Sequence, residues 1–319
     1  MQVDKSIFHH DYNQEPFWWE AARPGERHAA SLPASTDVLI VGSGYAGLSA
    51  ALELRRGGRE ATVVDALAFG EGASSRNGGG VSAGINLGKG IAGTPGQDGR
   101  ADAGRRLVEN LMSESLAAYE LVKTLIAREE IACHFEERGR FVGAFTKDDY
   151  RGLAGKAELL NRLIGVDATV VPPEGQSSEI GSDFYCGGMV IKRAGKLHPA
   201  LYHKGLLDAC HRAGVTLCAH THVSVIEGAP GRFIVRTSRG ECRAEQVVVA
   251  TNGYNRSSDA YAAAAHRADF QPNHRHGGIA GGSGAGTHSE WPDHLRNTAG
   301  HELLPAAAGR PTGDVWRAG

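Results

Sequence analysis

The chain has 319 residues, and its 34 Lys and Arg nearly balance its 36 Asp and Glu, leaving a formal net charge of −2. This length excludes a single short binding module, since domains usually have about 100–200 residues. Because the charges nearly balance, the chain lacks the excess of Lys and Arg that binds nucleic acid or an anionic membrane. We therefore expect neither as a partner. Glycine is the unusual residue: there are 44, and 16 of them lie between Gly42 and Gly99.

The five cysteines are scattered, odd in number and free of C-x-x-C spacing, so they indicate neither a disulfide framework nor a zinc site. The first residues are polar and lack the apolar core of a signal peptide. No apolar run reaches the ~20 residues of a membrane helix. We therefore expect a cytoplasmic protein without a membrane span.

Residues 1–36 show no clear periodicity and contain three prolines. They also contain Phe17, Trp18 and Trp19, whose large apolar surfaces are costly to leave in water. We expect this tail to pack on the body of the protein.

A clear pattern begins at Thr36. It predicts a strand (Asp37–Val41), a glycine turn, a helix (Tyr45–Arg56) that ends at a Gly-Gly pair, and a second strand (Ala61–Asp65). This order is typical of the opening unit of a doubly wound sheet.

The elements after residue 70 follow from apolar periodicity and turn residues. They are a glycine-rich loop (71–99), a helix (Ala101–Glu130), a strand (Gly139–Phe145), a helix (Asp148–Ile164), a strand (Gly188–Lys192), a helix (Pro199–Ala213) and strands at Val215–Ala219, Val223–Glu227, Arg232–Thr237 and Gln246–Ala250. The last strands predict a small antiparallel ribbon that returns to a parallel core strand.

Residues 255–319 differ in composition from the rest of the chain. They contain five Val, Ile or Leu, no Lys and six of the 15 His. Such a segment buries too little apolar surface to offset the cost of ordering its backbone, so we expect it to be disordered. Its histidines lack ligand spacing, so no metal site is predicted.

The first motif is Gly42-Ser43-Gly44-Tyr45-Ala46-Gly47, a G-x-G-x-x-G sequence between the first strand and the first helix. Gly42 permits a tight turn, Gly44 lets the backbone approach a pyrophosphate, and Gly47 allows close packing of the helix on the strand. Asp65, 18 residues after Gly47, would accept hydrogen bonds from a ribose hydroxyl. Together these features predict dinucleotide binding; the alternative is a tight turn without a ligand.

The second motif is the segment Gly72–Gly80, which follows the second strand. It offers the hydroxyls of Ser74 and Ser75, the guanidinium of Arg76, and glycines that admit a flat ring. They could reach the other half of a dinucleotide, and the choice between NAD and FAD turns on this segment. The alternative is a flexible polar loop.

Several motifs together resemble the FAD-dependent D-amino acid oxidase family, which includes glycine oxidase, sarcosine oxidase and gamma-glutamylputrescine oxidase. They are GSGYAG, Asp65 in place of the more common Glu, GASSRNGG, Lys196-Leu197-His198-Pro199, Thr221-His222-Val223 and Ala250-Thr251-Asn252-Gly253. The Trp18-Trp19-Glu20-Ala21-Ala22 tail is similar to gamma-glutamylputrescine oxidase in particular. The resemblance covers about residues 12–254.

The resemblance implies an α/β fold: a Rossmann-like FAD-binding domain of the glutathione-reductase type with an incomplete α+β substrate domain. The FAD-binding domain would comprise residues 37–95 and 190–254. Residues 96–189 would form part of the substrate domain, and residues 1–36 would be a tail packed on the body. The C-terminal half of the family has no counterpart after Tyr254. We therefore interpret 255–319, rich in Ala, Gly, His and Arg, as a disordered or frameshifted tail of a truncated protein.

The resemblance also implies the cofactor-binding residues. They are Gly42, Ser43, Gly44, Tyr45, Ala46, Gly47, Asp65, Ala73, Ser74, Ser75, Arg76, Asn77, Gly78, Gly79, Val223, Thr251, Asn252 and Gly253. Val223 would meet adenine through its backbone, although periodicity alone permits a plain strand residue. His198 is interpreted as a helix cap or packing residue rather than a catalyst, since Pro199 suits a helix start.

By the same resemblance, the protein is a flavoprotein oxidoreductase that acts on the C–N bond of an amine or amino acid. A hydride would pass to flavin N5, water would hydrolyse the imine, and oxygen or another acceptor would reoxidise the flavin. No catalytic residue is assigned. Two alternatives stay open: a non-catalytic FAD-binding fragment and an NAD-linked dehydrogenase.

Overall fold

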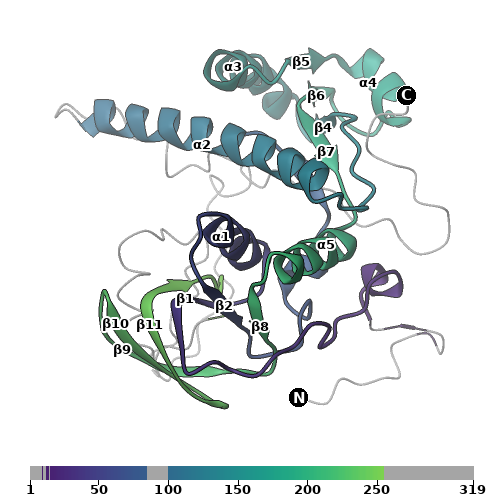
Figure 1. Cartoon of the computed structure of the whole chain (residues 1–319). Helices are drawn as coiled ribbons and strands as arrows, with labels where there is room; N and C mark the ends of the chain where they lie inside the picture. The colour runs from purple at the N-terminus through teal and green to yellow at the C-terminus, as the bar shows by residue number, and fades with distance from the viewer. Residues whose placement is uncertain (1–8, 10–11, 14, 85–99, 255–319) are drawn as a thin grey trace, which may run out of the picture. The chain divides into compact units, whose positions relative to one another are not determined.

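The computed structural model describes residues 9, 12–13, 15–84 and 100–254 (Figure 1). They form two compact units. Unit 1 contains the described parts of 1–78, 126–133 and 198–273, and unit 2 contains those of 79–125 and 134–197. Each unit is described by itself below.

Unit 1 is built on a six-stranded sheet with the order β8-β2-β1-β11-β10-β9. Its strands are β1 (Ser35–Val41), β2 (Ala61–Val64), β8 (Thr216–Cys218), β9 (Val223–Ala229), β10 (Arg232–Thr237) and β11 (Gly240–Val249). The pairs β8–β2, β2–β1 and β1–β11 are parallel, whereas β10 pairs antiparallel with β11 and β9 antiparallel with β10. Every residue of β2 is buried, as expected for a parallel strand covered on both faces.

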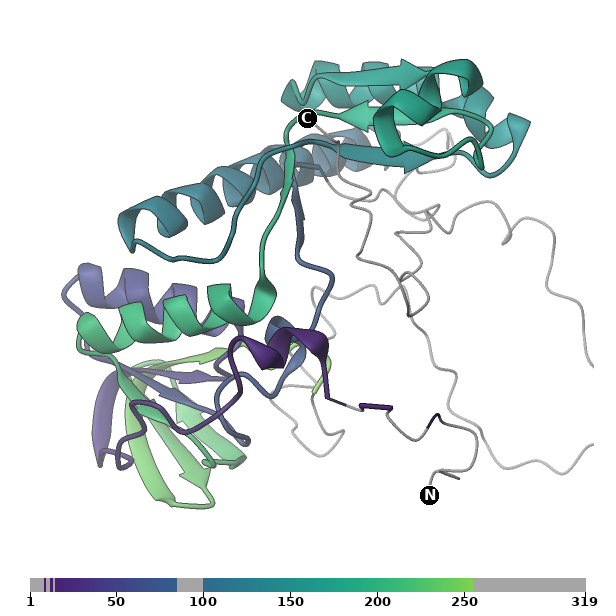
Figure 2. The ribbon, with the colours of Figure 1, turned by 90° about the vertical axis from the view of Figure 1, so that its right-hand side faces the viewer.

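Helices α1 (Tyr45–Arg56) and α5 (Pro199–Arg212) lie side by side on one face of this sheet (Figure 2). On the sheet itself, Leu39 and Val64 form a buried cluster with side chains of the β9–β11 ribbon, including Phe233 and Val235. The α/β class and the ribbon that returns to a parallel core strand are therefore confirmed.

Strand β11 extends the prediction and β8 corrects it. β11 is one strand of ten residues, in which 240–244 pair with β10 and 243–249 pair with β1. Only its end, Gln246–Val249, was predicted. The segment predicted at Val215–Ala219 does not belong to the ribbon, because β8 pairs with β2 at the opposite edge of the sheet. A short apolar run is equally compatible with a strand of the antiparallel ribbon and with a parallel strand beside β2, so periodicity could not distinguish these two positions.

The N-terminal segment lies against unit 1 where it is described. A 3-10 helix, η2 (Phe17–Glu20), begins after Pro16. Gly25 forms a β-bridge with Phe69, and the N–H of Ala30 donates to the carbonyl of Leu217 at 2.7 Å.

Unit 2 contains a three-stranded antiparallel sheet with the order β4-β6-β5. Its elements are α2 (Arg100–Arg128, with 100–125 in this unit), β4 (Arg140–Gly143), α3 (Lys147–Ile164), β5 (Ala168–Val171), η4 (Pro173–Gly175), α4 (Gln176–Ile180) and β6 (Gly188–Ile191). Helix α3 begins at a capping box formed by Thr146 and Asp149 and ends at Gly165, which has a positive φ of 57°.

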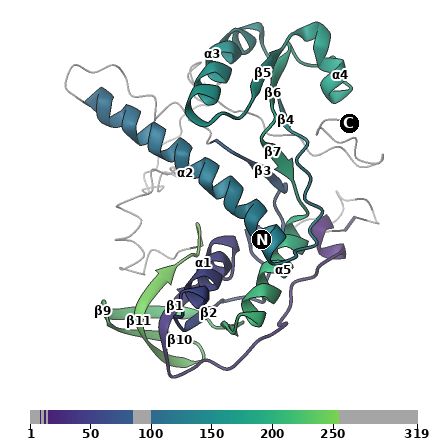
Figure 3. The ribbon, with the colours of Figure 1, turned by 45° about the horizontal axis from the view of Figure 1, so that its top comes forward.

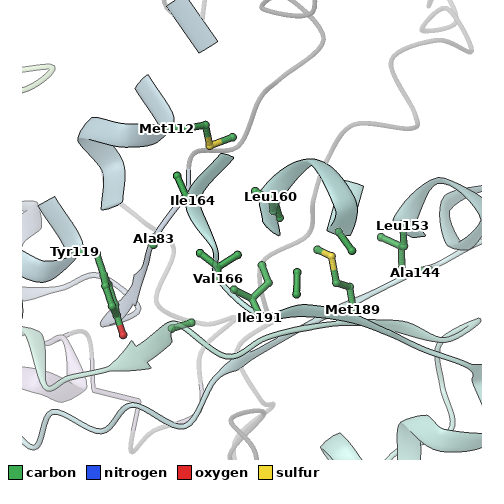
Figure 4. Close-up of a cluster of buried hydrophobic side chains, with 13 residues drawn as sticks. Ala83, Met112, Tyr119, Ala144, Leu153, Leu160, Ile164, Val166, Met189 and Ile191 are labelled. Atoms are coloured by element: carbon green, nitrogen blue, oxygen red, sulfur yellow. The ribbon is translucent and has the colours of Figure 1, made fainter. Parts of the chain in front are cut away.

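The core of unit 2 lies between α3, α2 and the sheet (Figure 4). Met112 and Tyr119 of α2 are 1% and 2% exposed, and they belong to the same cluster as Leu160 of α3 and Met189 of β6. The apolar spacing that predicted α2 and α3 therefore marks the buried faces of these helices.

Two short strands, β3 (Gly80–Ser82) and β7 (Ala194–Lys196), pair antiparallel in unit 2 (Figure 3). They were not predicted, since their small residues show no alternation. This pairing places 79–84 and 190–197 in one unit, whereas the expected domain boundaries fall at 95/96 and 189/190. Residues 126–133, expected in the substrate domain, belong to unit 1. The expected tail 255–319 lies outside the described residues.

Candidate functional site: a dinucleotide cleft in unit 1

The connection from β1 to α1 and the first residues of α1 (together residues 42–47, the glycine loop) are shaped by residues without side chains. Gly42 has a φ of +107°, and a Cβ there would lie 2.6 Å from the carbonyl oxygen of Ala250. A Cβ at Gly47 would lie 2.0 Å from the carbonyl oxygen of Gly42. Both positions therefore require glycine: Gly42 for its positive φ and Gly47 for the close packing of α1 on the loop.

Gly44 is the N-cap of α1 and has extended backbone, with φ −69° and ψ −178°. A Cβ at Gly44 would find one neighbour within 4 Å, the Oγ of Ser74 at 3.0 Å. The bare backbone thus leaves a cradle at the N-terminus of α1, where the first helical N–H groups and the helix dipole favour an anion. This is the arrangement that a pyrophosphate requires.

Asp65 directly follows β2 and faces the glycine loop. Its Oδ2 accepts hydrogen bonds from the N–H and hydroxyl of Ser43 at 2.8 and 2.6 Å, and its Oδ1 accepts from the N–H of Leu67 at 3.0 Å. A carboxylate has about four acceptor positions, so one more donor fits. A ribose hydroxyl would be such a donor.

These groups line one cleft of about 910 Å³, within the range of about 300–1,000 Å³ typical of ligand pockets. Its walls come from the glycine loop, the end of β2, residues 70–74, β9 and residues 249–254. Four of its lining side chains are large, apolar and at least 37% exposed: Leu67, Val225, Val249 and Tyr254. The cleft therefore combines a polar side for phosphates and ribose with an apolar side suited to a flat base.

Eleven of the predicted cofactor residues line the cleft: Gly42, Ser43, Gly44, Tyr45, Ala46, Asp65, Ala73, Ser74, Val223, Thr251 and Asn252. The other seven are not among its lining residues: Gly47, Ser75, Arg76, Asn77, Gly78, Gly79 and Gly253. Asn252 has a φ of +51°, in the left-handed region that asparagine tolerates. Its turn is closed by a hydrogen bond from Tyr254 N–H to the Thr251 carbonyl at 3.0 Å.

The second connection that lines the cleft, residues 70–77 (the serine loop), is held by side chains. Ser74 Oγ accepts the N–H of Tyr45, the first residue of α1, at 3.2 Å. Ser75 is buried and donates its hydroxyl to the carbonyl of Gly70. The amide of Asn77 donates to the carbonyls of Ala73 and Ser74 at 3.2 and 3.0 Å. In this structure Ser75 and Asn77 therefore fix the loop, while Ala73 and Ser74 face the cleft.

His203 is a site residue that the sequence analysis did not select. It lies on α5, is 4% exposed and lines the cleft. Its Nε2 lies 2.8 Å from the carbonyl oxygen of Ser43. A carbonyl only accepts, so this nitrogen is the donor. Burial lowers the pKa of His203, although the bond to Ser43 and the charge of Asp65 oppose that shift. A polar residue on a buried helix face was the sole sequence signal.

His198 is the N-cap of α5, and its Nδ1 accepts the N–H of Leu201 at 3.2 Å. The interpretation of His198 as a cap is confirmed. Tyr45 reaches the same helix start, since its hydroxyl donates to the Pro199 carbonyl at 3.0 Å. Burial raises the pKa of Tyr45 to about 12, so the phenol is neutral near pH 7.

The part of the chain that the structure describes also bears on metal binding and membrane crossing. In those residues, no group of three or more His, Cys, Asp or Glu is arranged to hold a metal ion. None of the helices there has the length and apolar character needed to cross a membrane. The C-terminal histidines lie outside the described residues.

The fold and this cleft define a dinucleotide-binding protein. Residues 37–301 match the family model described as DAO, FAD dependent oxidoreductase, and the chain belongs to this family. The match extends past residue 254, where the resemblance in the motifs ended. Because the family is FAD-dependent, the dinucleotide is FAD, and the NAD-linked alternative is set aside.

Curated relatives support the same family. The chain is 30% identical over 242 residues to a probable oxidoreductase OrdL of Rhizobium meliloti, covering 74% of this chain and 54% of the relative. It is 30% identical over 222 residues to gamma-glutamylputrescine oxidoreductase of Escherichia coli, covering 68% of this chain and 49% of the relative. The chain thus spans about half the length of these relatives.

Solved structures agree on the fold. Glycine oxidase from Geobacillus kaustophilus matches with a TM-score of 0.54 and 23% identity, over 68% of this chain and 55% of that protein. At 23% identity, this match shows a similar fold and nothing about function.

Proposed function

We propose that the chain binds FAD in the cleft of unit 1 and that the protein oxidises the C–N bond of an amine or amino acid. The observation that carries the proposal is the cradle at Gly44, where bare backbone at the N-terminus of α1 faces a cleft that also contains Asp65. When bound, FAD supplies the electron acceptor for the oxidation. The substrate class is supported by the name of the Escherichia coli relative, gamma-glutamylputrescine oxidoreductase.

In this proposal, different residues of the chain bind the pyrophosphate, the ribose and the adenine of FAD. The N–H groups at the start of α1 bind the pyrophosphate, and the extended backbone of Gly44 admits its approach. Asp65 accepts a ribose hydroxyl with the acceptor position that Ser43 and Leu67 leave unused. The apolar side of the cleft along β9, including Val225, receives the adenine, and the backbone of Val223 contacts it.

The remaining predicted residues act less directly. Arg76, Gly78 and Gly79 follow the cleft-lining part of the serine loop, and Gly253 follows Thr251 and Asn252. We propose that Arg76, Gly78 and Gly253, which belong to unit 1, contact the cofactor beyond the lining of the cleft, toward its ribityl and flavin side. Oxygen or another electron acceptor is the proposed second substrate, which would reoxidise the cofactor.

A second candidate is FAD binding without turnover of an amine. It is favoured by the cleft itself, since the groups assigned to it above hold a dinucleotide and none of them is assigned a role toward an amine. Both candidates require the cleft to bind FAD, so binding and turnover must be measured separately.

The test begins with the visible spectrum of the purified 319-residue protein, titrated with FAD. Gly44→Ala adds a Cβ that occupies the cradle, and its one neighbour within 4 Å, Ser74 Oγ at 3.0 Å, must give way slightly. Hydrogen bonds to charged groups contribute about 1.5–3 kcal/mol, so the FAD Kd should rise about tenfold or more. Gly57→Ala is the matched control at the other end of α1, where a Cβ would lie 3.4 Å from the nearest atom.

FAD binding that is equal in the Gly44→Ala and Gly57→Ala variants would contradict the assignment of the cleft. Turnover is then tested by anaerobic addition of gamma-glutamylputrescine or glycine to the FAD-loaded protein. Loss of the oxidised flavin spectrum selects the oxidase. An unchanged spectrum with tight FAD binding selects the second candidate.

A further inference from the structure

We propose that Trp19, in the N-terminal segment, is a positioning residue that holds the serine loop in its cofactor-binding shape. This inference rests on the proposed binding of FAD in the cleft of unit 1. It assigns to the N-terminal segment a role in cofactor binding beyond packing on the body.

The central contact joins Trp19 to Ser75. The indole Nε1–H of Trp19 donates to Ser75 Oγ at 2.8 Å across 56 residues of sequence. Ser75 is 2% exposed, and its own hydroxyl hydrogen goes to the carbonyl of Gly70. An indole N–H donates only, so it fixes which way the hydroxyl points. Trp19 thereby completes the hydrogen bonding of a buried serine at the centre of the loop.

A second contact joins Trp19 to the next residue of the loop. The guanidinium of Arg76 lies over the indole ring, 5.7 Å from its centroid. This distance is within the range of cation–π attraction. Trp19 therefore contacts two consecutive residues of the serine loop, one through its N–H and one through its ring.

The contacts of Trp19 continue to the cleft wall. Gly70, which accepts from Ser75, has a φ of +92° and lines the cleft. A Cβ at Gly70 would lie 3.4 Å from Nδ1 of His203, whose Nε2 donates to Ser43 in the glycine loop. A shift of Ser75 would therefore move a wall residue that packs against the support of the other loop.

The segment that carries Trp19 is attached independently of it. Trp18 packs edge-on against His198 with the ring centroids 4.8 Å apart. Gly25 and Phe69 exchange two backbone hydrogen bonds at 3.1 and 3.0 Å. Because these attachments do not involve Trp19, its contribution to the loop is separable from the docking of the segment.

The experiment uses the 319-residue protein with Trp19→Phe, which keeps an aromatic ring but removes the N–H donor. Trp18→Phe is the matched control, one residue away in the same 3-10 helix. Two quantities are measured: the Kd for FAD, and the rate at which trypsin cleaves the FAD-free protein after Arg76, with the cut mapped by mass spectrometry. Thermal unfolding of each FAD-free variant checks that the fold is retained.

We expect Trp19→Phe to weaken FAD binding by about tenfold, the size of a lost hydrogen bond that leaves the buried Ser75 hydroxyl without a donor to accept from. Cleavage after Arg76 should accelerate, and Trp18→Phe should match the wild type within about twofold in both measurements. The proposal is overturned if Trp19→Phe behaves like the wild type, or if Trp18→Phe loses as much affinity and protection as Trp19→Phe.

A wild-type protein that does not bind FAD would contradict the proposed function instead. In that case cleavage of the FAD-free protein alone decides whether Trp19 positions the loop. Faster cleavage in Trp19→Phe than in Trp18→Phe supports the positioning role, and equal rates overturn it.

Discussion

The glycine loop (42–47) and the serine loop (70–77) line the same cleft, but opposite means hold them in place. In the glycine loop the backbone itself is the constraint, because a Cβ at Gly42 or Gly47 would overlap a carbonyl oxygen. In the serine loop side chains are the constraint, since Ser75 bridges Gly70 and Trp19. The first loop should therefore fail when an atom is added, and the second when an atom is removed.

The strongest test of this difference is Gly47→Ala. Its Cβ would lie 2.0 Å from the carbonyl oxygen of Gly42, so α1 or the loop must shift. We expect the free energy of unfolding to fall by about 3 kcal/mol, the upper part of the range for overpacking, with loss of FAD binding. Urea denaturation followed by circular dichroism measures the change.

The control for Gly47→Ala is Gly152→Ala in α3, where a Cβ would meet nothing within 4 Å. An exposed helical glycine replaced by alanine should stabilise the protein by up to about 1 kcal/mol. Equal effects of the two substitutions would show that close approach does not constrain the glycine loop.

The serine loop is tested by Ser75→Ala. The change leaves the buried carbonyl of Gly70 and the half-buried N–H of Trp19 without their partner. We expect the free energy of unfolding to fall by about 1–3 kcal/mol. Ser178→Ala is the comparison, since Ser178 also donates to a glycine carbonyl, that of Gly175 at 2.7 Å, but is exposed. Ser178→Ala should lower the free energy of unfolding by less than about 0.5 kcal/mol. A decrease as large as that caused by Ser75→Ala would refute the argument from burial.

The smallest expected effect concerns His203, which touches both loops. Burial lowers the pKa of His203 from the ordinary value of 6.5. Below pH 6.5, His203 is therefore protonated more readily in the unfolded chain than in the folded chain. This contribution to stability is therefore complete above the unfolded pKa and is lost as the pH falls toward the folded pKa.

His203→Gln tests this contribution, because the amide still offers an N–H to Ser43 but does not titrate. Urea unfolding is compared at about pH 7.5 and about pH 5.5. The wild type should lose more stability over this interval than the variant. Equal losses would mean that His203 does not titrate differently in the folded and unfolded chains.

Several elements were predictable because the information is local. The helix Tyr45–Arg56 has the predicted bounds, since a glycine turn precedes it and a glycine pair follows it. Helix α4 was not predicted, because five residues are too few to show a helical period. Strand β5 was also not predicted, although strands of the same length, β2, β4 and β6, were.

The sequence by itself determined the glycine loop and the position of Asp65. Both follow from constraints within the first β-α-β unit: a positive φ, the close approach of α1, and a strand that ends at a carboxylate. Only the tertiary structure decided how the serine loop is held and that His203 supports Ser43. Those contacts join residues 56 and 160 positions apart, and no local pattern records which distant side chain will complete a buried hydrogen bond.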